Sequence, residues 1–435
     1  MNHKNQKRIA RNRRRIGILL LLGLAAFVSA SQAQPVIMQP PHFSVPPPGS
    51  PQAQNNEMQV FNPAAAFLNM LEEINPYQWG PVSFRPSISY SYSYATGVQS
   101  GPGTNSSSVV QTVSPNFLFL VGSHWTLDYT PSWTFYSSSQ LQDSLSHSAS
   151  LIWGTSYEDW NLGFSQGYSR SDTPLTQTAA QTDQQSYSTA LNASYQFNTK
   201  MSLSMAVSQS IGLVSSSGNL TNSLGTLANS YSWSTTETLN YQFWPRLTAG
   251  IGVGVGFSTQ AGSPDSLNEH YSANVSWRAT DKISFQVSGG VQDQQYLGGG
   301  AAGDLITPTF GGTIQYQPLK HTQFSLSVTR SISPSYFQSQ DTISTGYTVT
   351  LNQQLPENFS LALTGGYATT DYTATSSGVS VERSDDTYSF SASLSHSLTK
   401  RGTVSASYSY SENNSNISGP AYSSEQIGVQ VSYQF

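Results

Sequence analysis

Residues 87–94 read Ser-Ile-Ser-Tyr-Ser-Tyr-Ser-Tyr, with serine on one parity and a large apolar or aromatic residue on the other. Successive side chains of a β-strand point to opposite faces of the sheet, so this period of two predicts a strand with one apolar and one polar face. The pattern recurs at residues 388–395 and 404–410 and continues through most of residues 82–435. The region is therefore predicted to be all-β, with almost no helix.

The connections between the predicted strands alternate in length. Longer loops rich in Ser, Gly and Asp are interleaved with brief turns near residues 122–123, 155–156, 198–199, 245–246, 280–281, 320–321, 356–357 and 400–401. Eight short turns and nine long loops imply 18 antiparallel strands, although 16 remain compatible with the weaker patterns near residues 84–122 and 298–300. Ten-residue alternating strands joined in this way are typical of a transmembrane up-and-down β-barrel.

A soluble β-sandwich or propeller would show the same alternation. The placement of aromatic rings has to distinguish these folds from a membrane barrel. Rings gather beside the short turns and again toward the long loops, with aliphatic or small residues between them. Trp233 and Phe243 are ten residues apart. At about 3.3 Å per residue and about 40° of tilt, they stand roughly 25 Å apart along the membrane normal, the height of a barrel's apolar band. The rings therefore predict two membrane-interface girdles.

The composition sets further limits. Only 9% of the residues are charged, 12% are aromatic and none is cysteine, which excludes a disulfide scaffold, a thiolate metal site and an acylated lipoprotein cysteine. Seven of the 18 basic residues precede the apolar run Ile16–Val28, and Ser31-Gln32-Ala33 follows as a small-x-small cleavage site. Residues 1–33 are predicted to be a signal peptide; a non-cleaved anchor is the alternative. Without them, 18 − 7 = 11 basic residues face 23 acidic ones, a formal charge of −12 that argues against nucleic acid as a partner.

Three segments follow the predicted cleavage site. Residues 34–60 are rich in Pro and Gln and are interpreted as a periplasmic linker. Residues 61–76 predict a short amphipathic helix, with Asn62-Pro63 at its start and Asn75-Pro76 at its end. Residues 82–435 form the predicted barrel.

The last predicted strand alternates to its end through Ile427, Val429, Val431, Tyr433 and Phe435. With the signal segment and the alternation before it, this strand resembles the Gram-negative outer-membrane β-barrel superfamily, porin-like and without a match to a specific characterised family. The resemblance implies a bacterial outer-membrane location and contact with membrane lipids and lipopolysaccharide. It also implies that the barrel-assembly machinery reads Val431, Tyr433 and Phe435.

The polar parity predicts the lining of the lumen. Asp128 and Arg278 are the only charges among the interior positions assigned, which include Thr126, Asn274 and Gln286. Ion-selective pores use rings of charged residues, and the strands show none, so the sequence favours a channel for passive passage of small polar solutes. Two alternatives remain: an export conduit for a polymer such as exopolysaccharide, working with periplasmic partners, and a structural or adhesive barrel.

A stripe of glycines lies on the same inward parity. Gly250, Gly252, Gly254 and Gly256 leave one wall without side chains, which would allow another element to approach closely. The helix at residues 63–73 is the candidate plug, and a helix lying in the periplasm is the alternative.

The motifs that could carry chemistry are weak, and the protein is predicted not to be an enzyme. Residues 163–167 match G-x-S-x-G, but in mid-strand. If Trp153 opposes Trp160, His147 opposes Gln166 on the lipid side and Ser165 points into the lumen, so no catalytic pair forms. The remaining histidines occur singly, and neither a metal nor a cofactor is predicted.

Glu237 does not fit the expected pattern, because it shares the lipid-facing parity of Leu239 and Phe243. A β-bulge that shifts the register is the favoured explanation. A subunit interface is the alternative, and it predicts a homo-oligomer that contacts itself through this sector.

Overall fold

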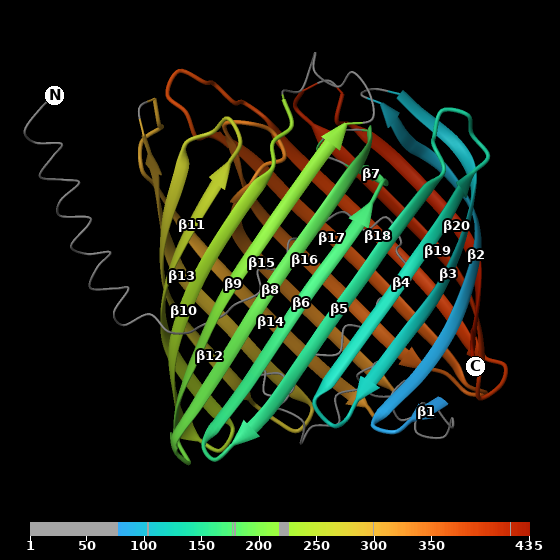
Figure 1. Ribbon diagram of the computed structural model, residues 1–435, viewed down its shortest axis with the longest axis horizontal. Helices are drawn as coiled ribbons and strands as arrows, with labels where there is room; N and C mark the ends of the chain where they lie inside the picture. Colours follow the sequence, from blue (N-terminus) through green and yellow to red (C-terminus); the bar gives the residue numbers. More distant parts are fainter. Residues whose placement is uncertain are drawn as a thin grey trace, which may run out of the picture.

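The computed structural model describes residues 77–101, 104–175, 177, 180–216, 226–298, 300–417 and 419–435. Of its 20 strands, β1 (Tyr77–Trp79) and β7 (Pro174–Leu175) lie outside the ring, which leaves 18 strands in one closed antiparallel barrel (Figure 1). The predicted all-β barrel is confirmed, whereas the signal peptide, linker and helix predicted for residues 1–76 lie outside the described residues. The barrel strands are β2 (Val82–Gly101), β3 (Thr104–Val121), β4 (Trp125–Tyr136), β5 (Ser144–Tyr157), β6 (Trp160–Ser171), β8 (Ala180–Asn198), β9 (Met201–Ser216), β10 (Ser230–Trp244), β11 (Leu247–Gln260), β12 (Asp265–Arg278), β13 (Ile283–Leu297), β14 (Leu305–Leu319), β15 (Thr322–Pro334), β16 (Gln340–Gln354), β17 (Phe359–Ala374), β18 (Ser384–Ser397), β19 (Gly402–Ser415) and β20 (Tyr422–Gln434).

The barrel closes where its last strand pairs with its first. Ile88 of β2 lies opposite Tyr433 of β20, and Tyr90 lies opposite Val431. The backbone N–H of Phe435 donates to the carbonyl of Pro86 at 3.1 Å. An aromatic strand of this kind would be an unprotected edge in an open sheet, and closure pairs it on both sides.

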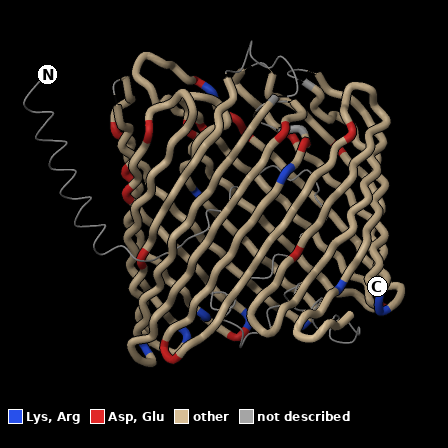
Figure 2. Tube along the Cα trace, in the orientation of Figure 1, with Lys and Arg blue, Asp and Glu red and all other residues tan. Residues whose placement is uncertain are grey.

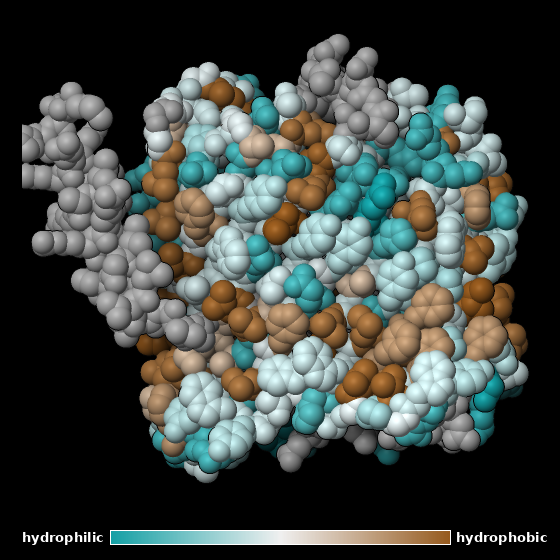
Figure 3. Space-filling view, in the orientation of Figure 1, coloured by the Kyte–Doolittle hydropathy of each residue, from teal (hydrophilic) through white to brown (hydrophobic). Residues whose placement is uncertain are grey.

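The alternation in sequence sorts residues onto the two faces of the wall. Large apolar side chains such as Ile251, Val349 and Val429 are between 52% and 68% exposed on the outside. Figure 3 shows apolar and aromatic side chains spread over one side of this outer surface. No helix among the described residues is long and apolar enough to cross a membrane.

Rings form stacked or tilted cross-strand pairs near both ends of the wall. Toward the short turns, the pairs are Trp125–Trp153, Trp160–Tyr195, Trp277–Phe285 and Tyr316–Phe324. Toward the long loops, they are Tyr168–Tyr187, Tyr347–Tyr367 and Tyr367–Tyr388. These are the two predicted girdles, and amphipathic rings are favoured at this depth because each has an apolar body and Tyr and Trp also a polar tip.

Turns of two to four residues join the strands at one end of the barrel, where the C-terminus also lies (Figure 1). Most connections at the other end are longer, although only residues 102 and 103 separate β2 from β3. The turn predicted at residues 155–156 is misplaced. Strand β5 continues to Tyr157, and the turn is made by Glu158, with φ at +52°, and Asp159. Trp153 therefore lies opposite Phe164, and Trp160 lies opposite Tyr157.

This shift corrects the predicted pairing of His147 with Gln166. His147 lies opposite Arg170, and Gln166 lies opposite Leu151. Each outward polar group instead has a different partner: the ring of His147 is 3.0 Å from the Tyr129 hydroxyl, and the Thr189 hydroxyl donates to the Gln166 amide oxygen at 2.7 Å.

The bulge predicted at Glu237 is also wrong. The ladders of β10 run without interruption past this residue, and the only register shift toward β11 lies between Gln242 and Trp244, near the short turn. Glu237 is flanked by Met205 on β9 and Val253 on β11. Its side chain therefore projects from the lipid-facing side of a regular wall.

Burial and charge are distributed unevenly along the barrel axis. Most buried side chains, including Phe337, Tyr372 and Arg383, lie at the long-loop end. Figure 2 shows most charged residues near the two ends of the barrel, with acidic residues prominent at the long-loop end. The packed part of this protein is thus its mouth rather than the middle of its wall.

Candidate pore and its constriction

The inward face of the wall is lined by hydroxyl and amide side chains. In β4, for example, Thr126 and Asp128 alternate with Trp125 and Leu127, which face outward. Asn274 and Gln286 occupy the same inward parity on β12 and β13, in cross-strand positions opposite Ser288 and Ser276 respectively. Arg278 ends β12 at the short-turn mouth, where its backbone N–H donates to the carbonyl of Arg246 at 2.8 Å.

Asp128 lies in a polar group on the inner wall. The Asn116 amide donates to Asp128 and, at 2.8 Å, to the Thr130 hydroxyl. Arg85 projects from the same face of β2, separated from Asp128 by Leu118 of β3. Arg85 shares its parity with the serines of residues 87–93, so the alternation alone could have identified it as an inward charge.

The glycine stripe of β11 is covered by its cross-strand neighbours. A Cβ at Gly250 would come within 2.4 Å of the Asn240 side-chain oxygen and 2.9 Å of the Asn274 amide nitrogen. A Cβ at Gly252 would come within 2.8 Å of the Ser272 hydroxyl. These glycines leave room for side chains of the adjacent strands, so the predicted bare wall is occupied; the helix proposed to approach it lies outside the described residues.

The tip of the β15–β16 hairpin folds into the mouth of the barrel. The Gln260 amide of β11 donates to the carbonyls of Ser335 and, at 3.1 Å, of Phe337. The backbone N–H of Ala228, from the β9–β10 connection, donates to the carbonyl of Tyr336 at 2.9 Å. Phe337 is 3% exposed as a result. The tip is therefore fixed on the inner side of the wall instead of extending into solvent.

A second connection meets this tip from the other side of the barrel. Gln177 belongs to the β6–β8 connection, and its side-chain oxygen accepts the Ser335 hydroxyl and the Tyr336 backbone N–H, both at 3.2 Å. The Gln177 carbonyl accepts Nη1 of Arg383, just before β18, at 3.1 Å. In the ring order, β9–β16 separate β8 from β17 on one side. The contacts therefore bridge two nearly opposite parts of the wall.

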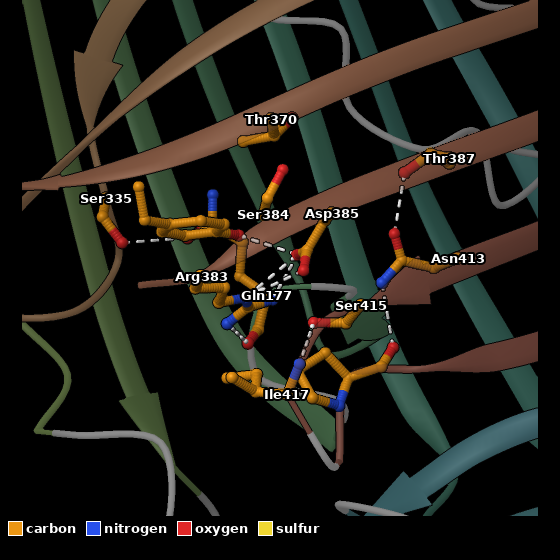
Figure 4. A network of polar contacts seen from close by, with 12 residues as sticks. Gln177, Ser335, Thr370, Arg383, Ser384, Asp385, Thr387, Asn413, Ser415 and Ile417 are labelled. Carbon is orange, nitrogen blue, oxygen red and sulfur yellow. Dashed lines mark hydrogen bonds and ion pairs between the residues drawn. The ribbon is translucent and has the colours of Figure 1, made fainter. Parts of the chain in front are cut away.

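The bridge is centred on a buried ion pair (Figure 4). Nε and Nη2 of Arg383 contact the Asp385 carboxylate, at 3.0 Å and 2.6 Å to Oδ2, and both side chains are no more than 5% exposed. The guanidinium carbon lies 4.3 Å from the centroid of the Tyr372 ring, whose hydroxyl donates to Asp385 at 3.2 Å. The planar guanidinium has a carboxylate on one edge and an aromatic ring against its face, which makes the arrangement rigid. We call Arg383, Asp385, Tyr372 and Gln177 the latch.

Asp341 anchors the base of the in-folded hairpin, above the upper girdle. Its carboxylate accepts the Tyr296 hydroxyl at 2.8 Å and the Gln294 amide, both from β13, and the residue is 4% exposed. Burial without a cationic partner disfavours the charged form, and it raises the pKa of Asp341 to about 6, although the two hydrogen bonds oppose this change. The hairpin is thus attached through a carboxyl group whose neutral form is favoured by its burial.

The in-folded tip leaves a chamber between itself and the opposite wall. The cavity has a volume of about 380 Å³ and is bounded on one side by Pro334, Ser335 and Tyr336. Its wall is formed by β2–β6, β8–β10, β19 and β20, and no Asp, Glu or Lys is among the described residues that line it. The two basic lining residues, Arg170 and His147, have the outward parity; Arg170 bonds to Asp183 at 3.2 Å, and the His147 ring is 3.0 Å from the Tyr129 hydroxyl. Hydroxyl side chains therefore dominate the lining of this chamber.

The serine of the G-x-S-x-G motif and its nearest histidine lie on different faces of the wall. Ser165 lies on the inward face of β6, whereas His147 is on the outward face of β5, so the two do not form a nucleophile–base pair. Among the residues that the structure describes, no group of three His, Cys, Asp or Glu is arranged to hold a metal ion.

Sequence reasoning missed the latch. Nothing in the local sequence pattern relates Gln177 to Arg383, which is 206 residues away. The polar residues of a loop carry no period that reports what they touch, so only the folded mouth brings them together.

Comparisons with known proteins give one family-model match and several similar solved structures. A family model described as "Putative beta-barrel porin 2" matches residues 265–435, which span β12 to β20. No curated protein matches the sequence. Similar solved structures include OccK11 (OpdR) of Pseudomonas aeruginosa, at 12% identity and a TM-score of 0.40, covering 81% of this chain and 96% of that one. OpdL of Pseudomonas aeruginosa has 12% identity and a TM-score of 0.43 over 82% and 99% of the two chains. The siderophore receptor PirA of Acinetobacter baumannii has 8% identity and a TM-score of 0.42 over 81% and 80%.

Proposed function

We propose that this protein is an outer-membrane channel for the passive passage of small polar solutes, and that the chamber beside the in-folded hairpin sets its selectivity. The protein is a porin-like barrel of the bacterial outer membrane, with an apolar outer band, two aromatic girdles and a hydroxyl-lined interior. The observation that carries the proposal is the chamber lining, in which the described residues include no Asp, Glu or Lys. A wall without charged rings gives little preference for either sign of ion.

The same chamber favours uncharged polar solutes. Serine and threonine hydroxyls both donate and accept hydrogen bonds, so they can replace the water lost by a neutral polar solute. They offer no counter-ion to a charged solute that sheds its hydration shell. We expect small neutral solutes to pass, with Asp128, Arg85 and Arg278 acting nearer the short-turn mouth.

Assembly and environment form the rest of the proposal. Val431, Tyr433 and Phe435 lie on the lipid-facing parity of the closing strand. Their alternation supports recognition by the barrel-assembly machinery before β20 pairs with β2. The acidic residues of the long-loop end would face the lipopolysaccharide leaflet.

Planar-bilayer recording tests the channel directly. The refolded protein without its signal peptide is expected to give steady current with weak ion selectivity, read from the reversal potential in a salt gradient. A second recording on a chain that begins at Tyr77 separates the barrel from the segment before it. Strong selectivity would contradict the role of the chamber, and silence from both proteins would overturn the channel function.

A further inference from the structure

Strand β9 differs from the rest of the wall in composition. Met201–Ser216 contains no aromatic residue, whereas every other barrel strand has at least one. Met201 and Met205 are the only methionines in residues 77–435, and both occupy the lipid-facing parity of β9. The aromatic girdles are therefore interrupted at this strand: Met201 lies opposite Tyr241 and Gln209 opposite Trp233, with Met205 between them.

Polar side chains gather on the lipid-facing side around the same strand. Thr189 of β8 lies opposite Gln209 of β9, and Glu237 of β10 lies opposite Met205. Glu237 is midway between Trp233 and Tyr241 of the two girdles. Hydrophilic side chains interrupt the apolar surface midway up the wall formed by β6, β8 and β9 (Figure 3). We call the outward face formed by Thr189, Met201, Met205, Gln209, Thr235 and Glu237 the β9 face.

In the part of the chain that the structure describes, the opposite side of the barrel has no such polar groups between the girdles. Between the girdles, the outward positions of β18, β19 and β20 are apolar, as in Leu394, Ala406 and Val429. Lipid tails offer no hydrogen bonds, so a carboxylate or carboxamide exposed to them is unfavourable, whereas the apolar far side suits lipid. The regular ladders at Glu237 remove the bulge that would have turned this side chain inward.

A protein neighbour accounts for all three features of the β9 face. It would supply hydrogen-bond partners for Glu237, Gln209 and Thr235. It would also replace the lipid headgroups that aromatic residues otherwise anchor to. Methionine side chains adapt to irregular protein surfaces and are common where packing has to be flexible.

We propose that the β9 face is the interface between two copies of this chain in the membrane. Copies inserted by the same route share one orientation, so the symmetry axis that relates them runs along the membrane normal and brings equal heights together. The Glu237 carboxylate is an acceptor at mid-height, and the Thr235 hydroxyl and Gln209 amide on the same face are donors. A patch with both kinds of group can satisfy a second copy of itself.

Single-cysteine crosslinking tests this interface cleanly, because the chain contains no native cysteine. Val207→Cys places a thiol in the β9 face, opposite Leu191 and Thr235. Val429→Cys, on β20, is the matched control on the lipid-facing surface of the far side. The full-length proteins are expressed in outer membranes and treated with a short bis-maleimide. Heat-dependent gel mobility shows that each barrel is folded.

The proposal requires a crosslinked species of twice the monomer mass from Val207→Cys and none from Val429→Cys. Monomer alone from both, equal crosslinking of both, or a Val207→Cys adduct with a different protein would each overturn it. In the Val207→Cys background, Glu237→Gln should retain crosslinking, whereas Glu237→Leu should lower the dimer association constant about tenfold or more, the effect of losing one hydrogen bond to a charged group. Current recorded from the same samples keeps this result separate from the channel function.

Discussion

Breaking the latch should open the mouth of the barrel. Asp385→Ala removes the carboxylate that accepts Nε and Nη2 of Arg383 and leaves the guanidinium with the Gln177 carbonyl and the Tyr372 ring. Arg383 is buried, so its unpaired charge stays out of water unless the connections separate. Loss of one member of a buried ion pair costs about 3–5 kcal/mol.

This free energy would shift the equilibrium between a mouth in which Gln177 contacts Arg383 and one in which the two connections have separated. At about 1.4 kcal/mol for each tenfold change, even the lower figure shifts the ratio roughly a hundredfold toward release. Single-channel recording of Asp385→Ala should therefore show a larger main conductance or a much greater open fraction than the unmodified protein. Unfolding measurements on the same variant should show a largely intact barrel, because the wall hydrogen bonds are untouched.

A matched control uses the ion pair at the opposite end of the barrel. Arg246 Nη2 lies 2.7 Å from Asp281 Oδ1, but the two side chains are 52% and 82% exposed. Exposed pairs contribute about 0–1 kcal/mol, so Asp281→Ala should leave conductance almost unchanged. If Asp385→Ala and Asp281→Ala give the same open fraction and conductance, the latch does not hold the constriction and the reasoning fails.

Three further predictions concern the hairpin, the glycine stripe and the closing strand. The pKa of Asp341 is about 6 in the folded hairpin and 3.8 in its usual state. The protonated carboxyl therefore stabilises the in-folded tip fully below about pH 4. This stabilisation falls by up to about 3 kcal/mol as the pH rises through 6. The open fraction should therefore rise between pH 4 and 6, and Asp341→Asn should remove that dependence; an unchanged pH profile in the variant would contradict the assignment. Gly250→Ala should destabilise the barrel by about 1–3 kcal/mol in urea unfolding because its methyl meets Asn240, whereas Gly289→Ala, with open space around it, should change stability little. Deleting Phe435 should reduce the amount of folded barrel in outer membranes, measured by heat-dependent gel mobility, while refolding in detergent is nearly normal; equal amounts in the membrane would remove its role as an assembly signal.

The wall of this protein is predictable from its sequence because each side chain there faces either lipid or water. The alternation at residues 87–94 has a physical cause, lipid on one side and water on the other, and the same cause acts on all 18 strands. The predicted pairing of Trp153 with Trp160 failed because a two-residue turn at Glu158 and Asp159 replaced the expected one, and aromatic residues pair with several ring partners equally well.

The contacts that narrow the mouth could not be predicted from the sequence, because no single contrast between lipid and water determines them. Gln177, Ser335 and Arg383 come from three connections, and their partners are determined by how the loops pack across the lumen. Asp341 follows the strand alternation poorly because the hairpin tip leaves the wall there and packs against β13. Glu237 shows a third case, in which a regular strand places an acidic residue on the lipid-facing side of the wall.

The latch also bears on the order in which this protein can become selective. Gln177 and Arg383 are 206 residues apart, and Arg383 precedes only the last three strands. The contact between Gln177 and Arg383 therefore needs β17 and β18 in place across the ring from β6 and β8. Only β19 and β20 then remain before the seam with β2 can close. A chain that lacks the last third of the barrel strands thus loses both the closed wall and the contacts that narrow its mouth.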